Sequence, residues 1–115
     1  MPIVKSIDKV NTFNRIQSVD IHFNLNSESF VWDAAKAQKN LRKHGVRFEE
    51  AAAVFADPAF VLVQASRNDE AREAAIGFDV TGRLLYVVHI EVDAAFIRII
   101  SARRADPEEE QIYVV

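Results

Sequence analysis

Arginine is the residue type of this sequence best suited to chemistry, and four arginines fall at the ends of predicted strands. Arg72 opens one strand, whereas Arg98, Arg103 and Arg104 lie on or just after the last strand. Guanidinium groups stay charged and bind phosphate through paired hydrogen bonds. Because short turns connect the strands, we expect Arg72 to converge with the end of the last strand. This pattern suits a phosphate site, but ordinary ion pairs with the fourteen Asp and Glu residues of 30–115 are the commoner outcome and prevail when the arginines are taken alone.

Two of the three histidines lie where they could transfer a proton. His44 follows Lys43 at the end of a predicted helix, where binding to the terminal carbonyls is the commoner role and catalysis is the alternative. His89 lies near a strand end and is typical of a hydrogen-bonded rim residue or a proton shuttle. No two histidines have the spacing of metal ligands and the chain has no cysteine, so we predict no metal site.

Length and composition are those of a single globular domain. The chain has 115 residues, half of them hydrophobic and 27% charged, which excludes a disordered or low-complexity scaffold. A net charge of −3 argues against a general nucleic-acid coat but permits a local basic site. The apolar runs are only as long as strands, and the first residues contain no apolar leader segment. We therefore expect a cytoplasmic protein that does not cross a membrane.

The elements that must position these side chains are predicted to form an α+β domain. Asp33 is a good cap for a helix over 34–44, which Gly45 ends, and a second helix over 48–56 stops before Pro58. A terminal helix is expected from Pro107. The predicted strands cover 59–65, 72–79, 83–90 and 96–104. We therefore predict two N-terminal helices packed on a small antiparallel β-meander, followed by a C-terminal helix.

Two further expectations follow from the strands. Side chains alternate between strand faces, so Arg98 and Arg104 share one face unless a bulge intervenes, and Arg103 takes the other. Arg83 lies at a turn, where its removal is expected to have little effect.

Residues 1–29 are predicted to be an N-terminal extension of a compact domain over 30–115. A short helix is expected over 7–16, and the alternating residues 21–25 form a strand pattern. A polar stretch over 26–29 then separates the extension from Phe30.

The segment FVWDAAKAQKNLRKHGVRFEEAAAVFADP, residues 30–58, resembles the opening of BrnT-family toxins, F-x-W-D-x-x-K-x-x-x-N-x-x-K-H-G-[VI]-x-F-E-E-A. Downstream pieces match in the same order, ending with the R-I-I-S-A-R run over 98–103, so the resemblance covers residues 30–104. It implies a RelE-like ribonuclease fold and a toxin of a type II toxin–antitoxin system. The partner that it implies is a BrnA-type ribbon-helix-helix antitoxin.

The resemblance also implies a mechanism and its residues. RelE-like toxins cleave RNA, free or on the ribosome, without a metal or other cofactor: the 2′-hydroxyl attacks the adjacent phosphorus and basic groups stabilise the developing charge. The catalytic positions implied are Arg72, Arg104, Arg103, His44 and Tyr113. The substrate-binding positions implied are Lys43, Arg98 and His89.

Some residues depart from the family pattern. The terminal helix is acidic where the family has a basic one, and Glu73 stands where an aromatic residue is usual. Arg47 replaces the usual small residue before F-E-E. These departures favour an alternative, a degenerate toxin that binds its antitoxin but no longer cleaves RNA. The four arginines favour an active endoribonuclease, and both readings stay open.

Overall fold

The computed structural model of the protein describes residues 18–65 and 72–114. The helix predicted over 7–16 lies outside these residues. None of the described helices is long and apolar enough to cross a membrane.

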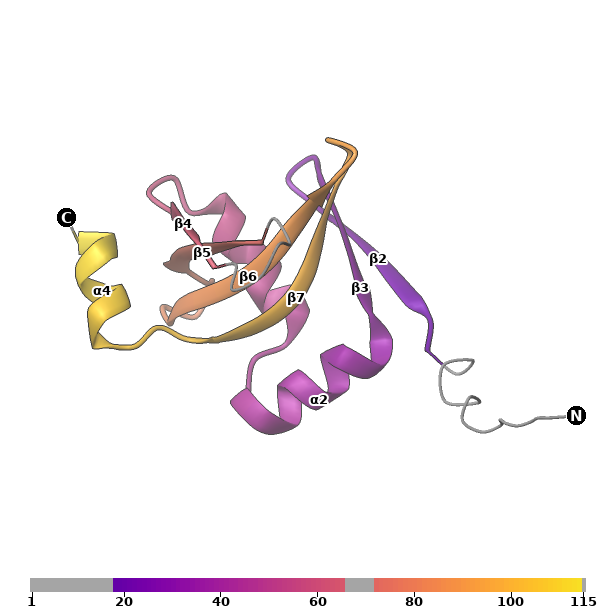
Figure 1. Ribbon diagram of the computed structural model, residues 1–115, viewed down its shortest axis with the longest axis horizontal. Helices are drawn as coiled ribbons and strands as arrows, with labels where there is room; N and C mark the ends of the chain where they lie inside the picture. Colours follow the sequence, from indigo (N-terminus) through magenta and orange to yellow (C-terminus); the bar gives the residue numbers. More distant parts are fainter. Residues whose placement is uncertain (1–17, 66–71, 115) are drawn as a thin grey trace, which may run out of the picture.

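The described chain is built on one mixed sheet of six strands, in the order β2-β3-β7-β6-β5-β4 (Figure 1). The strands are β2 (Asp20–Leu25), β3 (Glu28–Asp33), β4 (Val61–Gln64), β5 (Glu73–Phe78), β6 (Leu84–Val92) and β7 (Phe96–Arg104). Neighbouring strands pair antiparallel, except that β3 runs parallel to β7.

The helices begin and end at residues with clear capping roles. They are α2 (Ala34–His44), α3 (Phe48–Ala52) with the following 3₁₀ turn η1 (Ala53–Ala56), and α4 (Pro107–Val114). The Asp33 carboxylate caps α2 by accepting a 2.9 Å hydrogen bond from the Lys36 N–H. Gly45 ends α2 with φ of 71°, a left-handed conformation that favours glycine. The sequence therefore fixes both ends of the helix that carries Lys43 and His44.

The prediction of two N-terminal helices on a small antiparallel meander is wrong. Two strands, β2 and β3, precede the first described helix, and the sheet has six strands in the described residues. It is mixed because β3 aligns Phe30 and Val31 parallel with Ile97 and Arg98 of β7. The strands from 61 to 104 do pair as a meander, but this meander is only part of the sheet.

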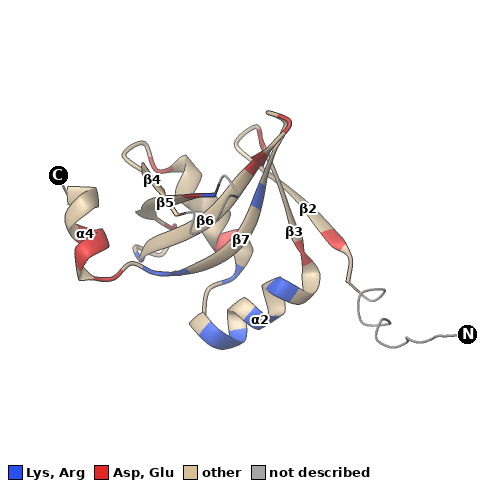
Figure 2. Cartoon of the chain, in the orientation of Figure 1, with Lys and Arg blue, Asp and Glu red and all other residues tan. Residues whose placement is uncertain are grey.

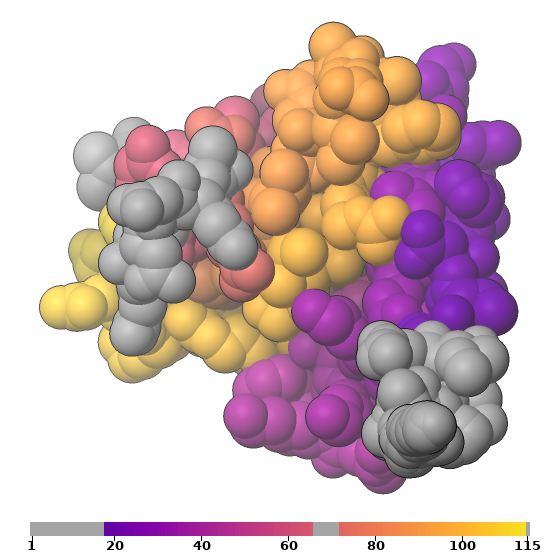
Figure 3. Space-filling view, turned by 45° about the vertical axis from the view of Figure 1, so that its right-hand side comes forward, coloured from indigo at the N-terminus to yellow at the C-terminus, as the bar shows by residue number. Residues whose placement is uncertain are grey.

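Strand β3 was missed because its pattern does not alternate. Phe30, Val31 and Trp32 are all buried, so the period of two that marks a half-exposed strand is absent. The turn before it consists of Asn26 and Ser27, both with positive φ, which is the geometry of a two-residue hairpin. Figure 3 shows the resulting β2–β3 hairpin, in indigo, lying beside β7.

The core lies between the sheet and the helices α2 and α3. Its largest fully buried side chains come from β3, α3, the sheet centre and the segments next to them: Trp32, Phe30, Phe48, Leu85, Ile99, Val46, Val54 and Val87. Gly77 of β5 allows the closest approach, since a Cβ there would lie 2.9 Å from both Phe60 Cβ and Val54 Cγ1. The core thus fixes η1 against β5 and the helices against β7.

A bulge in β7 changes which arginines share a face. Ser101 pairs with Val88 and Ile99 pairs with His89, so Ile100 has no counterpart on β6. As a result, Arg98 opposes Ile90 and Arg103 opposes Tyr86. These β6 residues are four apart, so Arg98 and Arg103 share one face, and Arg104 takes the other.

Candidate functional site

The buried side-chain amide of Asn40 attaches the C-terminal end of α2 to β7, and we call its hydrogen bonds the Asn40 clamp. The side chain of Asn40 donates to the carbonyls of Val46 at 3.0 Å and Ala102 at 2.8 Å, and it accepts from the Ala102 N–H at 3.0 Å. Asn40 is the buried residue of α2. These three bonds place the last turn of α2, which carries Arg42, Lys43 and His44, next to the end of β7.

His44 is held in its neutral form by this environment. Partial burial lowers its pKa below the ordinary value of 6.5, and the positive charges of Lys43 and Arg103 lower it further. A histidine at a helix C-terminus usually gains from its positive charge. Here desolvation and the two cations prevail, so a neutral imidazole able to accept a proton lies beside two permanent cations.

Arg103 is the cation of β7 that reaches this end of the molecule. Its guanidinium donates two 2.8 Å hydrogen bonds to the two carboxylate oxygens of Glu109 on α4, and it lies 4.3 Å from the centre of the Tyr86 ring. Figure 2 shows basic residues on α2 and on the last part of β7, with the acidic start of α4 following directly. We call Lys43, His44 and Arg103, together with the next residue Arg104 on the other face of β7, the basic end.

The structure does not bring Arg72 to the basic end. Glu73 pairs with His89, whereas Arg104 pairs with Leu85, four residues away on β6. Arg72 is one residue further, so about 17 Å of strand separates it from Arg104 at roughly 3.3 Å per residue. The expected convergence is wrong because β5 and β7 run in the same direction, which places the start of β5 near the start of β7.

Arg98 also lies away from the basic end. Its guanidinium forms hydrogen bonds of 2.9 and 3.2 Å with the carboxylate of Asp20 on β2. The same bonds lower the pKa of Asp20. Arg98 thus ties the β2–β3 hairpin to β7.

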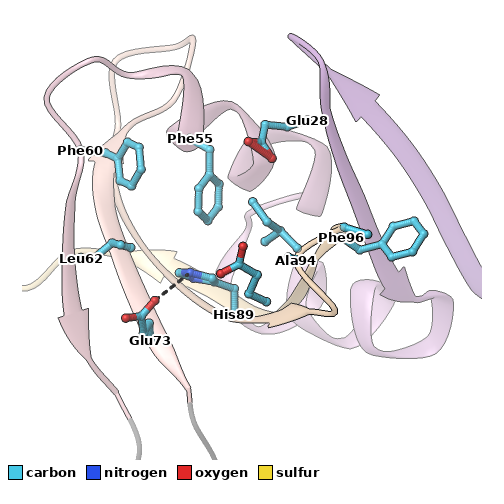
Figure 4. Close-up of a pocket in the computed structure, with 11 residues that line it drawn as sticks. Glu28, Phe55, Phe60, Leu62, Glu73, His89, Ala94 and Phe96 are labelled. Carbon is cyan, nitrogen blue, oxygen red and sulfur yellow. Dashed lines mark ion pairs between the residues drawn. The ribbon is translucent and has the colours of Figure 1, made fainter.

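His89 lies in a cleft near the start of β7. The residue is 4% exposed, its Nδ1 is 3.1 Å from the Val87 carbonyl, and Phe55 contacts its ring edge to face (Figure 4). Burial lowers the pKa of His89, which keeps the ring neutral at neutral pH. Three of the residues that line the cleft are Glu28, Glu73 and Glu91. This acidic surrounding opposes the binding of a phosphate.

Tyr113, which the resemblance implied as a catalytic position, contacts residues at the ends of η1 and β5. Its hydroxyl donates a 2.8 Å hydrogen bond to Asp57, and its ring packs edge to face on Phe78. These contacts attach α4 to the last residue of β5 and to the residue that follows η1. None of the contacts described for Tyr113 involves the arginines of the basic end.

Sequence reasoning missed three residues that shape the site. Asn40 stood in the family motif, which was the one signal in the sequence, and its burial and backbone bonds are seen only in the structure. Glu109 was noticed only as part of an acidic run, and nothing in the sequence showed which cation it would meet. Arg83 is not isolated at its turn: it forms 2.9 Å ion pairs with Glu50 and Asp79 and donates to the Gly45 carbonyl at 3.1 Å.

In the part of the chain that the structure describes, no group of three or more His, Cys, Asp and Glu side chains is arranged to hold a metal ion.

Comparison with known proteins identifies the family. A family model described as the ribonuclease toxin BrnT of type II toxin–antitoxin systems matches residues 32–109. The crystal structure of the Brucella abortus ribonuclease toxin BrnT is similar at 25% sequence identity with a TM-score of 0.53, over 65% of this chain and 92% of that chain. No curated protein matches the chain significantly. This chain belongs to the BrnT family of ribonuclease toxins of type II toxin–antitoxin systems.

Proposed function

We propose that this protein is a metal-independent endoribonuclease toxin that inhibits translation by cleaving mRNA in the cytoplasm. A BrnA-type ribbon-helix-helix antitoxin is its proposed partner. The observation that carries the proposal is that the bonds between Asn40 and Ala102 hold the last turn of α2, with Lys43 and His44, next to the end of β7 that carries Arg103.

The proposed reaction needs a base and fixed positive charge. His44 takes the proton of the RNA 2′-hydroxyl, whose oxygen then bonds to the adjacent phosphorus. The bond from phosphorus to the 5′-oxygen breaks, that oxygen takes a proton from water, and the hydroxide left behind removes the proton from His44 to restore the neutral ring. Arg103 and Lys43 stabilise the extra negative charge on the phosphorus oxygens, and Arg104 binds the neighbouring RNA backbone. Arg72, Arg98, His89 and Tyr113 stand outside this site.

A second candidate is a degenerate toxin that binds antitoxin without cleaving RNA. The bidentate Arg103–Glu109 pair favours it, because the carboxylate uses the two donors that a phosphate would need. However, the Arg103 side chain remains 37% exposed and no residue of α4 is buried. The Glu109 side chain is 14% exposed, so the pair is partly buried and contributes on the order of 1–3 kcal/mol, a cost that the binding of RNA must offset to displace Glu109.

Incubation of the purified full chain with labelled single-stranded RNA in EDTA, with and without ribosomes, separates the two functions. We expect cleavage by the wild-type chain and a loss of cleavage in His44→Asn, with Lys39→Ala as the matched control on the same helix. If the RNA stays intact in every reaction while the chain still binds its antitoxin, the protein is a degenerate toxin and not a nuclease.

A further inference from the structure

The cleft around His89 has a ligand chemistry opposite to that of the basic end. It has a volume of about 260 Å³ and is lined by the acidic residues Glu28, Glu73 and Glu91, and no Lys or Arg of the described ranges 18–65 and 72–114 lines it. Its apolar walls include Phe55 and Phe60, which Figure 4 shows facing the space above His89. Negative charge combined with aromatic walls is typical of a site for an organic cation.

The ring of His89 and the carboxylate of Glu73 face each other in this cleft. Because the Val87 carbonyl can only accept, the Nδ1 of His89 carries the ring proton, and Nε2 of the neutral ring is an acceptor. Nε2 lies 3.9 Å from the Glu73 carboxylate, which is also an acceptor (Figure 4). Two acceptors at this distance can share one donor group between them, and the His89 side chain is 5% exposed whereas that of Glu73 is 50% exposed, so the shared position opens to the cleft.

We propose that this cleft binds an arginine side chain presented by a polypeptide partner. The type II family supplies one partner of this class, the antitoxin. A guanidinium offers several N–H donors in one plane, so it can donate to His89 Nε2 and to Glu73 together. Its flat face and aliphatic stem suit the walls of Phe55 and Phe60.

The size and position of the cleft support one inserted side chain. Its volume lies below the range of about 300–1,000 Å³ that is usual for small-molecule sites. The Glu73–His89 pair is four residues along β6 from the Leu85–Arg104 pair, so roughly 13 Å of strand separates the cleft from the basic end. A partner anchored in the cleft can therefore reach over the basic end, and the inference does not depend on RNA cleavage.

The test uses the full chain, labelled with ¹⁵N, and the peptide acetyl-Gly-Arg-Gly-amide. Titration should shift the ring nitrogens of His89 and the amide signals of Glu73 and Glu91. The same peptide with citrulline, which keeps the shape of arginine but is neutral, should cause no shift. Glu73→Gln should weaken binding about tenfold, whereas Glu49→Gln on the surface of α3 should leave it unchanged.

Three results would overturn the inference. The first is the absence of shifts at His89 with the arginine peptide. The second is equal binding of the citrulline peptide, which would remove the role of charge. The third is tighter binding of spermidine than of the peptide, which would make the cleft a site for a small free cation. None of these binding experiments measures RNA cleavage. A negative result would therefore reject the arginine site without rejecting the proposed nuclease.

Discussion

The guanidinium of Arg103 and the carboxylate of Glu109 form two parallel 2.8 Å hydrogen bonds, so a side chain of α4 lies where the proposed reaction needs a phosphate. The N–H of Asp106 also donates to Glu109 at 2.9 Å, which fixes this carboxylate at the start of α4. An acid at this position competes with RNA for the same donors. The pair links the unusual acidic terminal helix to the basic end.

Replacement of Glu109 should therefore raise activity. Glu109→Gln removes the competing charge, and we expect RNA cleavage to rise by roughly fivefold for each kcal/mol that this partly buried pair contributes. Single-turnover cleavage of labelled RNA measures it. Glu108→Gln, on the same turn but without a described contact to Arg103, is the control. A Glu109→Gln chain that is slower than wild type would show that the pair supports the site.

The proposed base predicts the pH dependence of cleavage. The pKa of His44 is lowered below 6.5, so the neutral base persists at pH 7 and the rate should fall only as acid protonates the ring. We expect a flat rate near neutral pH and a decline below pH 6.5. An NMR titration of the His44 ring should give the same midpoint as the rate profile. Midpoints that disagree by more than a unit would exclude His44 as the base.

The Asn40 clamp should control both stability and activity. Asn40→Ala leaves the Ala102 N–H and two buried carbonyls without their partner, at a cost of about 1–3 kcal/mol in the free energy of unfolding. Cleavage should also fall, because the last turn of α2 is no longer held against β7. Urea denaturation and cleavage assays on the same preparation test this. Unchanged stability would mean that the clamp contributes nothing measurable.

Arg83 should contribute to the stability of the fold, contrary to the expectation that its removal has little effect. Its ion pairs join the turn between β5 and β6 to α3, and its side chain is only 20% exposed. Arg83→Ala leaves the fully buried Asp79 carboxylate without this partner, and we expect a loss of about 1–3 kcal/mol in the free energy of unfolding. Chemical denaturation measures the loss. Arg47→Ala, on the exposed start of α3, should change stability by less than about 0.5 kcal/mol.

Local signals in the sequence were enough for single elements but not for their arrangement. Asp33 and Gly45 predicted both ends of α2, and Pro107 predicted the start of α4, because caps act through neighbouring residues. The place of β3 depends on parallel pairing with β7, more than sixty residues away, and its buried run has no period to reveal it. Likewise, no local pattern showed that Ile100 is a bulge, and this one residue decides which arginines share a face.

The residues of the proposed site could likewise be predicted where a local motif marks them, but not where their position depends on how distant segments pair. The K-H-G motif at the end of α2 located Lys43 and His44, and the family resemblance located Arg103. Arg72 was grouped with them because strand directions were not counted: after two antiparallel pairings, the starts of β5 and β7 lie at the same end. The partner of Arg103 depends on the path of the chain after β7, which composition alone does not determine.

The most direct test of the central claim compares Arg103→Ala with Arg72→Ala in single-turnover cleavage of the same RNA. If the basic end performs the reaction, Arg103→Ala should lower the rate by about 10²–10³, the usual cost of one fixed donor. Arg72→Ala, about 17 Å of strand away, should retain activity within a few-fold. Both variants should keep the wild-type circular dichroism spectrum. An Arg72→Ala chain that loses cleavage while Arg103→Ala retains it would contradict the account and move the active site to the start of β5.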